Sequence, residues 1–357
     1  MKINIKNLPV SNLPYKDISL CKDMIIKLFE KIPFYAELPN LDEKENVIFR
    51  TFENIPGIKF EKDKKIGKNK VLLIKSESAK FEEYSNKLDE VYNSNNKTKF
   101  ENYSSESAFL QMYQNMLKRI SPKYTIVKLI GPFSFAEQIS NHETNFLISD
   151  KQYRKYIIQA IGIKALWYIN KIKELSPKTT PIILFEENEF YKFGTIKRNN
   201  ENINEDLIIS LFKNLFKKIQ ENNAYVGVQC FNKCNWHIII DANPDFISFG
   251  AYSNPNNLNV IPEKVHNFLT NGGYINWGII PVTNENIIMS SNISSLEERF
   301  KKTVENLANE GVSLDLLYRH SMVSVQGDLA DLPILYAEKA LILANQLSQK
   351  IPISSRL

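Results

Sequence analysis

The sequence predicts an α/β protein, a closed (β/α)8 TIM barrel with a hairpin and helical insertion after its second strand. Eight short β-type apolar runs occur along the 357 residues, and most of them are separated by segments with helical spacing. This alternation implies parallel strands joined by right-handed crossovers. Eight such strands predict a closed barrel.

The eight predicted strands are short and spread over the whole chain. They are residues 2–9, 32–38, 124–132, 181–187, 224–230, 245–252, 273–282 and 320–327. No Gly-x-Gly-x-x-Gly fingerprint follows the first of them, which disfavours the alternative of a doubly wound open sheet.

Four segments have the apolar spacing of amphipathic helices. In 204–223, leucine or isoleucine recurs at four-residue steps, and Asn204 or Asp206 is placed to cap the helix. The segment 294–311 opens with Ser-x-x-Glu, as in a capping box, and ends on Gly311. The other two predicted helices are 150–175 and 330–349.

One stretch interrupts the alternation, so we expect one barrel domain over 1–357 with an excursion at 57–121, between the second and third strands. Within it, "GIKFEKDKKIGKNKVLLIKS" predicts a β-hairpin with Gly67 near its turn.

Composition and charge are those of an ordinary globular protein. The formal net charge is +5, and lysines alternate with acids without a basic arm, which disfavours a nucleic-acid partner. Three cysteines give no disulfide framework, so a reducing compartment is favoured. No signal peptide is recognisable, and no apolar run reaches the ~18 residues of a membrane span. We therefore expect a cytoplasmic protein with no membrane partner.

Barrel enzymes carry their chemistry at the carboxyl ends of the strands. The residues at or just after the predicted strand ends are therefore the candidates for a site. They are Glu186, Glu187 and Asn188, then Gln229 and Cys230 through Cys234, then Gly250 and Tyr252, then Trp277, and finally Gln326.

Six segments, in order along nearly the whole chain, match the motif blocks of one barrel family. They are "SNLPYKD" (11–17), "IPFYAELPNLDEKENVIFRTFENIPGI" (32–58), "LIGPFSFA" (129–136), "IKALWYI" (163–169), "FEENEFYKFGT" (185–195) and "GGYINWGIIP" (272–281). The chain resembles the family that contains the C-terminal domain of cobalamin-independent methionine synthase. Its wider superfamily includes uroporphyrinogen decarboxylase and corrinoid-dependent methyltransferases.

The resemblance implies methyl transfer to a thiol that a zinc ion activates, but the zinc ligands are replaced in this sequence. The family's histidine position holds Gln229, its first cysteine position holds Phe231, and its acid position holds Gly250. No cysteine follows Cys234, so the last cysteine ligand is missing. Glutamine, phenylalanine and glycine do not hold zinc. Zinc is therefore the cofactor that the family implies, and the sequence provides none of the matching ligands.

A relocated metal site is an alternative. Cys230, Cys234 and His237 have the spacing Cys-x3-Cys-x2-His, and a helix over 233–240 would place Cys234 and His237 one turn apart. The other interpretation is that Cys230 packs as a small hydrophobe and His237 as a cap.

The acidic part of the site is kept. The family's acids after the fourth strand are implied to hold the amino group of an amino-acid substrate, and here Glu186 and Glu187 take those positions as candidate catalytic residues. The candidate substrate-binding residues are Asn188, Gln229, Tyr252, Trp277 and Gln326.

Three functions are compatible with this pattern. The first is a methionine-synthase-like methyltransferase without the usual zinc. Its methyl donor would be a folate or a corrinoid on a partner protein, and its acceptor an amino-acid-like or other small molecule. The second is a non-catalytic paralogue that binds a ligand or partner. The third is a metal-independent decarboxylase, but only Arg50 lies near the early loops where carboxylate-binding arginines belong.

Overall fold

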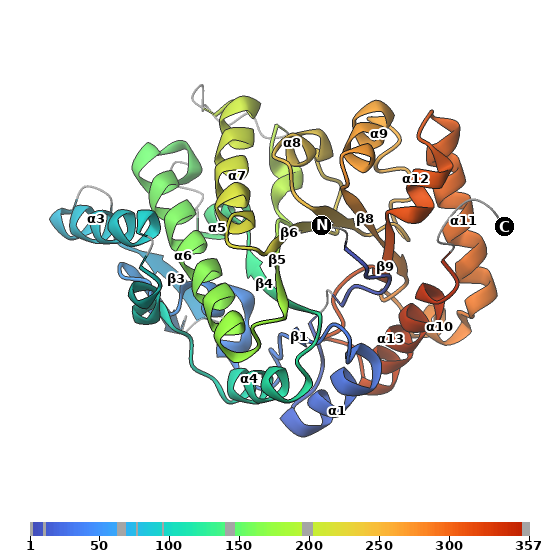
Figure 1. The fold of residues 1–357 in the computed structure, drawn as a ribbon, viewed down its shortest axis with the longest axis horizontal. Coiled ribbons are helices and arrows are strands. Elements are labelled where there is room, and N and C mark those ends of the chain that lie inside the picture. The colour runs from blue at the N-terminus through green and yellow to red at the C-terminus, as the bar shows by residue number, and fades with distance from the viewer. Residues whose placement is uncertain are drawn as a thin grey trace.

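The computed structural model describes residues 3–9, 12–62, 69–75, 78–94, 96–139, 147–194 and 203–351. It has an α/β fold in which seven parallel strands form one curled sheet, a partial barrel, with helices around its outside (Figure 1). In sheet order the strands are β1 (Phe34–Tyr35), β4 (Tyr124–Ile130), β5 (Thr180–Glu186), β6 (Tyr225–Cys230), β7 (Phe246–Phe249), β8 (Tyr274–Ile280) and β9 (Ser321–Val325).

Seven of the eight predicted strands are therefore present, and the first one is not. The N-terminal segment makes two isolated parallel bridges instead, Asn7 with Val323 of β9 and Asn12 with Glu37 next to β1. Proline explains the difference, because Pro9 has no N–H to donate to a ladder. The segment still lies between the two edge strands, since the Leu8 amide donates to the Val323 carbonyl at 3.0 Å.

The four predicted helices are present, with one cap corrected. Asn204 caps α7 by accepting a hydrogen bond from the Leu207 amide. The N-cap of α11 is Asn292 and not Ser294, so the predicted capping box is wrong by two residues. Gly311 follows α11 in the left-handed conformation, with φ +107°. The helices are α1 (Ile18–Phe29), α2 (Val47–Phe52), α5 (Pro132–Ile139), α6 (Lys151–Leu175), α7 (Glu205–Gln220), α8 (Trp236–Asp241), α9 (Pro262–Thr270), α10 (Glu285–Ser290), α11 (Ile293–Asn309), α12 (Leu314–Arg319) and α13 (Ile334–Ser348).

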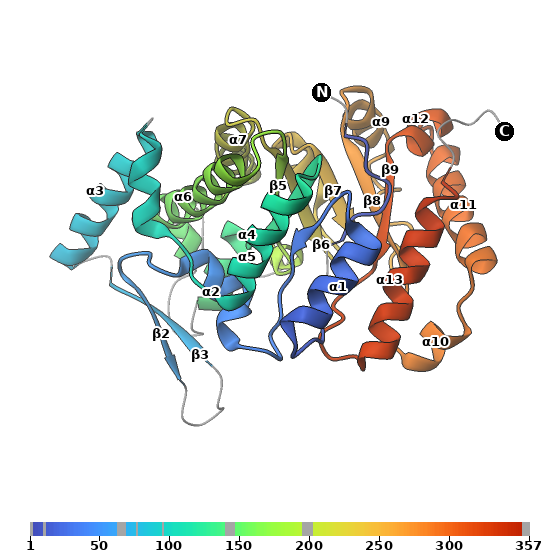
Figure 2. The same ribbon diagram turned by 60° about the horizontal axis from the view of Figure 1, so that its bottom comes forward.

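A long segment of the chain separates β1 from β4, where the sequence predicts the excursion at 57–121. It contains the antiparallel hairpin β2 (Ile58–Lys62) and β3 (Asn69–Leu73), then α3 (Ala79–Asn93) and α4 (Ala108–Ile120). Gly67, the predicted turn residue, lies outside the described residues. The hairpin projects from the body beside the carboxyl ends of the strands (Figure 2). Lys164 of α6 holds this excursion, because its buried ammonium donates to the carbonyls of Glu53 and Tyr103 at 2.8 and 2.6 Å.

The two faces of the sheet have different chemistry. Residues paired across parallel strands share a face, and the register aligns Glu186, Gln229, Ser248 and Asn276 on the inner one. Asn276 donates hydrogen bonds to Ser248 and Ser324, both at 2.8 Å. The outer face is apolar and packs against the helices.

None of the helices within the described ranges combines the length and the apolar character that crossing a bilayer requires.

Candidate functional site

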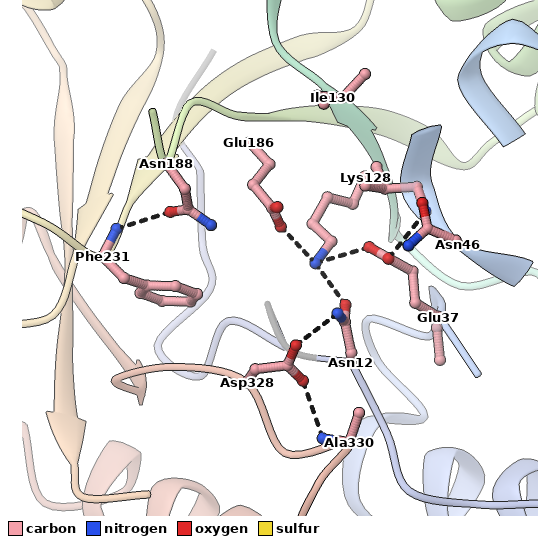
Figure 3. A network of polar contacts seen from close by, with 12 residues as sticks. Asn12, Glu37, Asn46, Lys128, Ile130, Glu186, Asn188, Phe231, Asp328 and Ala330 are labelled. Carbon is pink, nitrogen blue, oxygen red and sulfur yellow. Dashed lines mark hydrogen bonds and ion pairs between the residues drawn. The ribbon is translucent and has the colours of Figure 1, made fainter. Parts of the chain in front are cut away.

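A buried lysine forms the centre of the polar cluster inside the sheet. Lys128 lies near the end of β4, and its ammonium is 2.7 Å from a carboxylate oxygen of Glu37 and 2.9 Å from one of Glu186 (Figure 3). It also donates to the side-chain carbonyl of Asn12 at 2.7 Å. Three acceptors from three different elements therefore satisfy the three N–H bonds of one ammonium group.

The two carboxylates of this cluster differ in access. The Glu37 side chain is 2 % exposed and that of Glu186 is 16 % exposed, so Glu186 is the one that faces the mouth of the sheet. Burial by itself lowers the pKa of Lys128, but Glu186 and Glu37 outweigh burial and hold that pKa above its ordinary value. Lys128 therefore stays charged at neutral pH. Burial raises the pKa of Glu37, and the charges of Lys128 and Arg50 oppose that effect.

Arg50 of α2 supports the cluster from behind. Its guanidinium donates to the carbonyls of Tyr35 and Ala36 at 3.3 and 3.1 Å and lies 3.6 Å from Glu37. It also stacks on the Tyr35 ring, 4.1 Å from the ring centre. The side chain is only 2 % exposed. Arg50 therefore positions Glu37, and its donors point to the backbone and not to the mouth.

The N-terminal segment completes the cluster, which explains why it lies between the two edge strands. Besides accepting from Lys128, Asn12 donates to a carboxylate oxygen of Asp328 at 2.8 Å. The other Asp328 oxygen accepts from the Ala330 amide at 2.9 Å. Asn12 thus links the end of β4 to the loop after β9, because it contacts both Lys128 and Asp328 (Figure 3).

Glu187, the second predicted catalytic acid, points to a different place. Its two carboxylate oxygens accept hydrogen bonds from the amides of Phe133 and Ser134 at 3.1 and 2.8 Å, in the first turn of α5. Gly131 has to be glycine here, because a Cβ at that position would overlap the Glu187 carboxyl group. The side chain is buried and its acceptors face the helix. Glu187 therefore positions α5.

The ionisation of Glu187 predicts a pH effect on stability. Burial raises the pKa of Glu187 to about 7, against the opposing effect of the Ser134 and Phe133 amides, whereas the pKa in the unfolded chain is about 4.3. Between these values the folded state binds more protons, so this group lowers the free energy of unfolding as pH rises from about 4.3 to about 7. We expect Glu187→Gln to flatten this slope in urea unfolding measured across that range. The same slope in both proteins would contradict the assignment.

Three buried amide side chains, of Gln229, Asn276 and Gln326, lie in the strands or at their carboxyl ends. Gln229 is fully buried, and neither atom of its amide has a hydrogen-bond partner among the described residues. The Gln326 carbonyl accepts from Ser253, but its amide nitrogen has no partner there, nor has the Asn276 side-chain oxygen. Buried polar groups are nearly always hydrogen-bonded. These groups therefore offer neutral donors and acceptors to water or a small polar ligand.

The relocated metal site does not assemble. His237 lies on α8 and faces Glu205 at 3.1 Å, whereas Cys234 precedes the helix, so the expected helical spacing is wrong. Across the described part of the chain, no group of three His, Cys, Asp or Glu side chains is placed to hold a metal ion. Burial, then the Cys230 thiol and the Glu187 charge, raises the pKa of Cys234, which disfavours the zinc-binding thiolate.

The structure separates the other predicted substrate-binding residues. Asn188 is half-buried at the mouth, and its side-chain carbonyl accepts from the Phe231 amide at 3.0 Å (Figure 3). Tyr252 lies under the Arg299 guanidinium, 3.9 Å from the ring centre. Trp277 does not reach the mouth, because it is buried on the outer face, against Phe300 of α11. The inner site therefore contains Glu186, Asn188, Gln229 and Gln326, but not Trp277.

The central residue of the cluster was missed at the level of sequence. Lys128 is the one charged residue in the run "YTIVKLI", and a lysine inside a fully buried parallel strand requires an acidic partner. Glu37 is likewise the one charged residue in the apolar run "IPFYAEL". A charged residue inside an apolar run was thus the feature of the sequence that indicated the buried ion cluster.

Comparison with known proteins adds no identity to this geometry. No family model matches the chain, and no curated protein matches it.

Proposed function

We propose that this protein is a methionine-synthase-like barrel that binds a ligand without performing zinc-dependent methyl transfer. One observation carries the proposal. In the resembling family the acid at the position of Glu186 is implied to hold the amino group of the substrate, and here the ammonium of Lys128 lies 2.9 Å from that carboxylate. The chain's own lysine thus takes the place of the substrate's amino group.

Two further features support the proposal. The amides of Gln229 and Gln326 replace charged or soft donors on the inner face and suit an uncharged polar ligand. Gly250 also leaves little room for an acid, because a Cβ there would lie 3.1 Å from the Phe231 carbonyl oxygen and 3.2 Å from that of Gln326. The residues that stand where the family binds zinc are therefore adapted to neutral contacts.

Methyl transfer from a corrinoid or folate donor to an amino-acid-like or other small acceptor is the second candidate. The exposure of Glu186 toward the mouth favours it. The decarboxylase is weakened further, because the donors of Arg50 are used by backbone carbonyls and Glu37.

A chemical-rescue experiment tests the central observation. Lys128→Ala removes the ammonium and leaves a space that matches n-propylammonium. We expect n-propylammonium chloride to stabilise Lys128→Ala saturably, by about 1.4 kcal/mol at ten times its Kd, and so to raise the melting temperature of this variant. The melting temperature of the wild type is expected to stay unchanged. Sodium chloride and n-propanol at equal concentrations are the controls for ionic strength and for the alkyl chain. An equal rise of the melting temperature in Lys128→Ala and in the wild type would contradict this role of Lys128.

An activity assay separates the two candidate functions. We expect the wild-type protein, incubated with homocysteine, methylcobalamin and added Zn²⁺, to form no methionine above the protein-free rate. Methionine formation that Glu186→Gln abolishes would establish the methyltransferase instead.

A further inference from the structure

We propose that a lysine-lined cleft at the amino end of the sheet binds a small polyanion of the phosphate or carboxylate type. The cleft has a volume of about 830 Å³, and the N-terminal segment, α1, the start of β4 and the end of α13 form its walls. It lies at the end of the sheet opposite to Glu186 and the mouth. It is therefore separate from the site described above, and its test does not depend on the proposed function.

The charge of the cleft is strongly one-sided. Four lysines line it, and they are Lys6, Lys27, Lys31 and Lys123. A single acid, Glu30, also belongs to the lining, which leaves a formal excess of three positive charges. Within the ranges that the structure describes, Lys27, Lys31 and Lys123 have no carboxylate partner. Other surface lysines do pair, as Lys87 does with Glu83 and Lys301 with Glu297. Lys27, Lys31 and Lys123 therefore keep their charge available to an anion in the cleft.

The lysines come from separate elements. Lys27 lies in the last turn of α1 and Lys31 just beyond it, where the helix dipole by itself favours cations. That effect does not extend to Lys123, which precedes β4, or to Lys6, which lies in the N-terminal segment. Three elements thus bring positive charge to one cavity, which raises the local concentration of an anion.

Fixed polar groups lie among these mobile charges. The ammonium of Lys6 donates to the carbonyls of Tyr318 and Ser321 at 3.1 and 3.3 Å, so its charge is held in place. The side-chain nitrogen of Asn7, another residue of the lining, is buried and has no hydrogen-bond partner among the described residues. An anionic oxygen in the cleft would accept from this N–H and lie among the lysines.

The lining also contains apolar residues. They are Phe29, Ile32 and Tyr124, together with Ile5. A ligand with two or more anionic oxygens and a compact carbon or phosphorus frame suits this combination. Lysine contributes charge without a fixed planar fork, so a phosphate and a carboxylate are both accepted.

Isothermal titration with inorganic pyrophosphate and, separately, citrate tests the proposal at constant ionic strength. We expect saturable binding of at least one probe to the wild type. The triple variant Lys27→Gln/Lys31→Gln/Lys123→Gln is expected to weaken that binding at least about tenfold, since each exposed pairing contributes a few-fold. The matched control Lys80→Gln/Lys213→Gln/Lys302→Gln removes the same charge from α3, α7 and α11, and we expect it to bind as the wild type does.

Two outcomes would overturn the proposal. One is the absence of saturable binding of either probe to the wild type. The other is an equal loss of affinity in both triple variants, which would mean that net charge and not the cleft attracts the anion. The replaced lysines are exposed, so both triple variants are expected to fold, and equal melting temperatures verify this. Asn7→Leu gives a second variant without any change of charge, and it is expected to weaken binding as well.

Discussion

Replacement of Lys128 by methionine is expected to lower the free energy of unfolding by about 3–5 kcal/mol at pH 7. The substitution keeps the length of the side chain but leaves Glu37, which is 2 % exposed, without its closest cation. Arg50 lies farther away, at 3.6 Å, and its donors already serve two carbonyls. Urea unfolding of the two proteins measures the difference.

The pH dependence and a double variant give independent checks. Burial outweighs Lys128 and Arg50 and raises the pKa of Glu37 already in the wild type. Without Lys128 that pKa rises further above the unfolded value of about 4.3. The variant therefore loses stability as pH rises above about 4.3, and its deficit relative to the wild type shrinks toward that pH. The double variant Lys128→Met/Glu37→Gln is expected to recover part of the lost free energy of unfolding, because the second substitution removes the unpaired charge. A loss below about 1 kcal/mol at pH 7 would show that the ion cluster is not a structural centre.

Glu187→Ala is expected to destabilise the protein by about 2–5 kcal/mol, because it leaves two buried amides of α5 without an acceptor. The Phe133 and Ser134 amides both donate to this one carboxylate. Thermal or urea unfolding measures the loss, and Glu189→Ala, a change of a half-buried glutamate two residues away, is the matched control. A loss no larger than that of the control would remove Glu187 from its positioning role.

The neighbouring glycine tests the same contact from the other side. Gly131→Ala is expected to destabilise by about 1–3 kcal/mol, since its methyl group would overlap the Glu187 carboxyl group. In the double variant Gly131→Ala/Glu187→Ala the overlap disappears, so the two losses are expected to be less than additive. Strict additivity would mean that the two residues do not interact.

The fold illustrates where sequence patterns suffice and where they fail. Strands such as Tyr124–Ile130 are short apolar runs between helical segments, and such runs are recognisable because their burial is set by local periodicity. The run at 2–9 looked alike, yet it makes one bridge to β9 through Asn7, because Pro9 interrupts its hydrogen bonding.

The candidate site shows the same division. Placing Glu186 at a strand end required only the strand's length and direction. The roles of Glu186 and Glu187 could not be separated from the sequence, because adjacent residues on a strand point to opposite faces and the outcome depends on what each face meets. One carboxylate meets Lys128, and the other meets the first turn of α5.

By itself the sequence determined the alternation of strands and helices, since this depends on residue type and spacing along the chain. Only the tertiary structure decided that Glu37, Glu186 and Asn12 meet at Lys128, because these residues lie far apart in the chain and charge pairing acts through space. The same holds for the lysine-lined cleft, whose walls come from four separate segments.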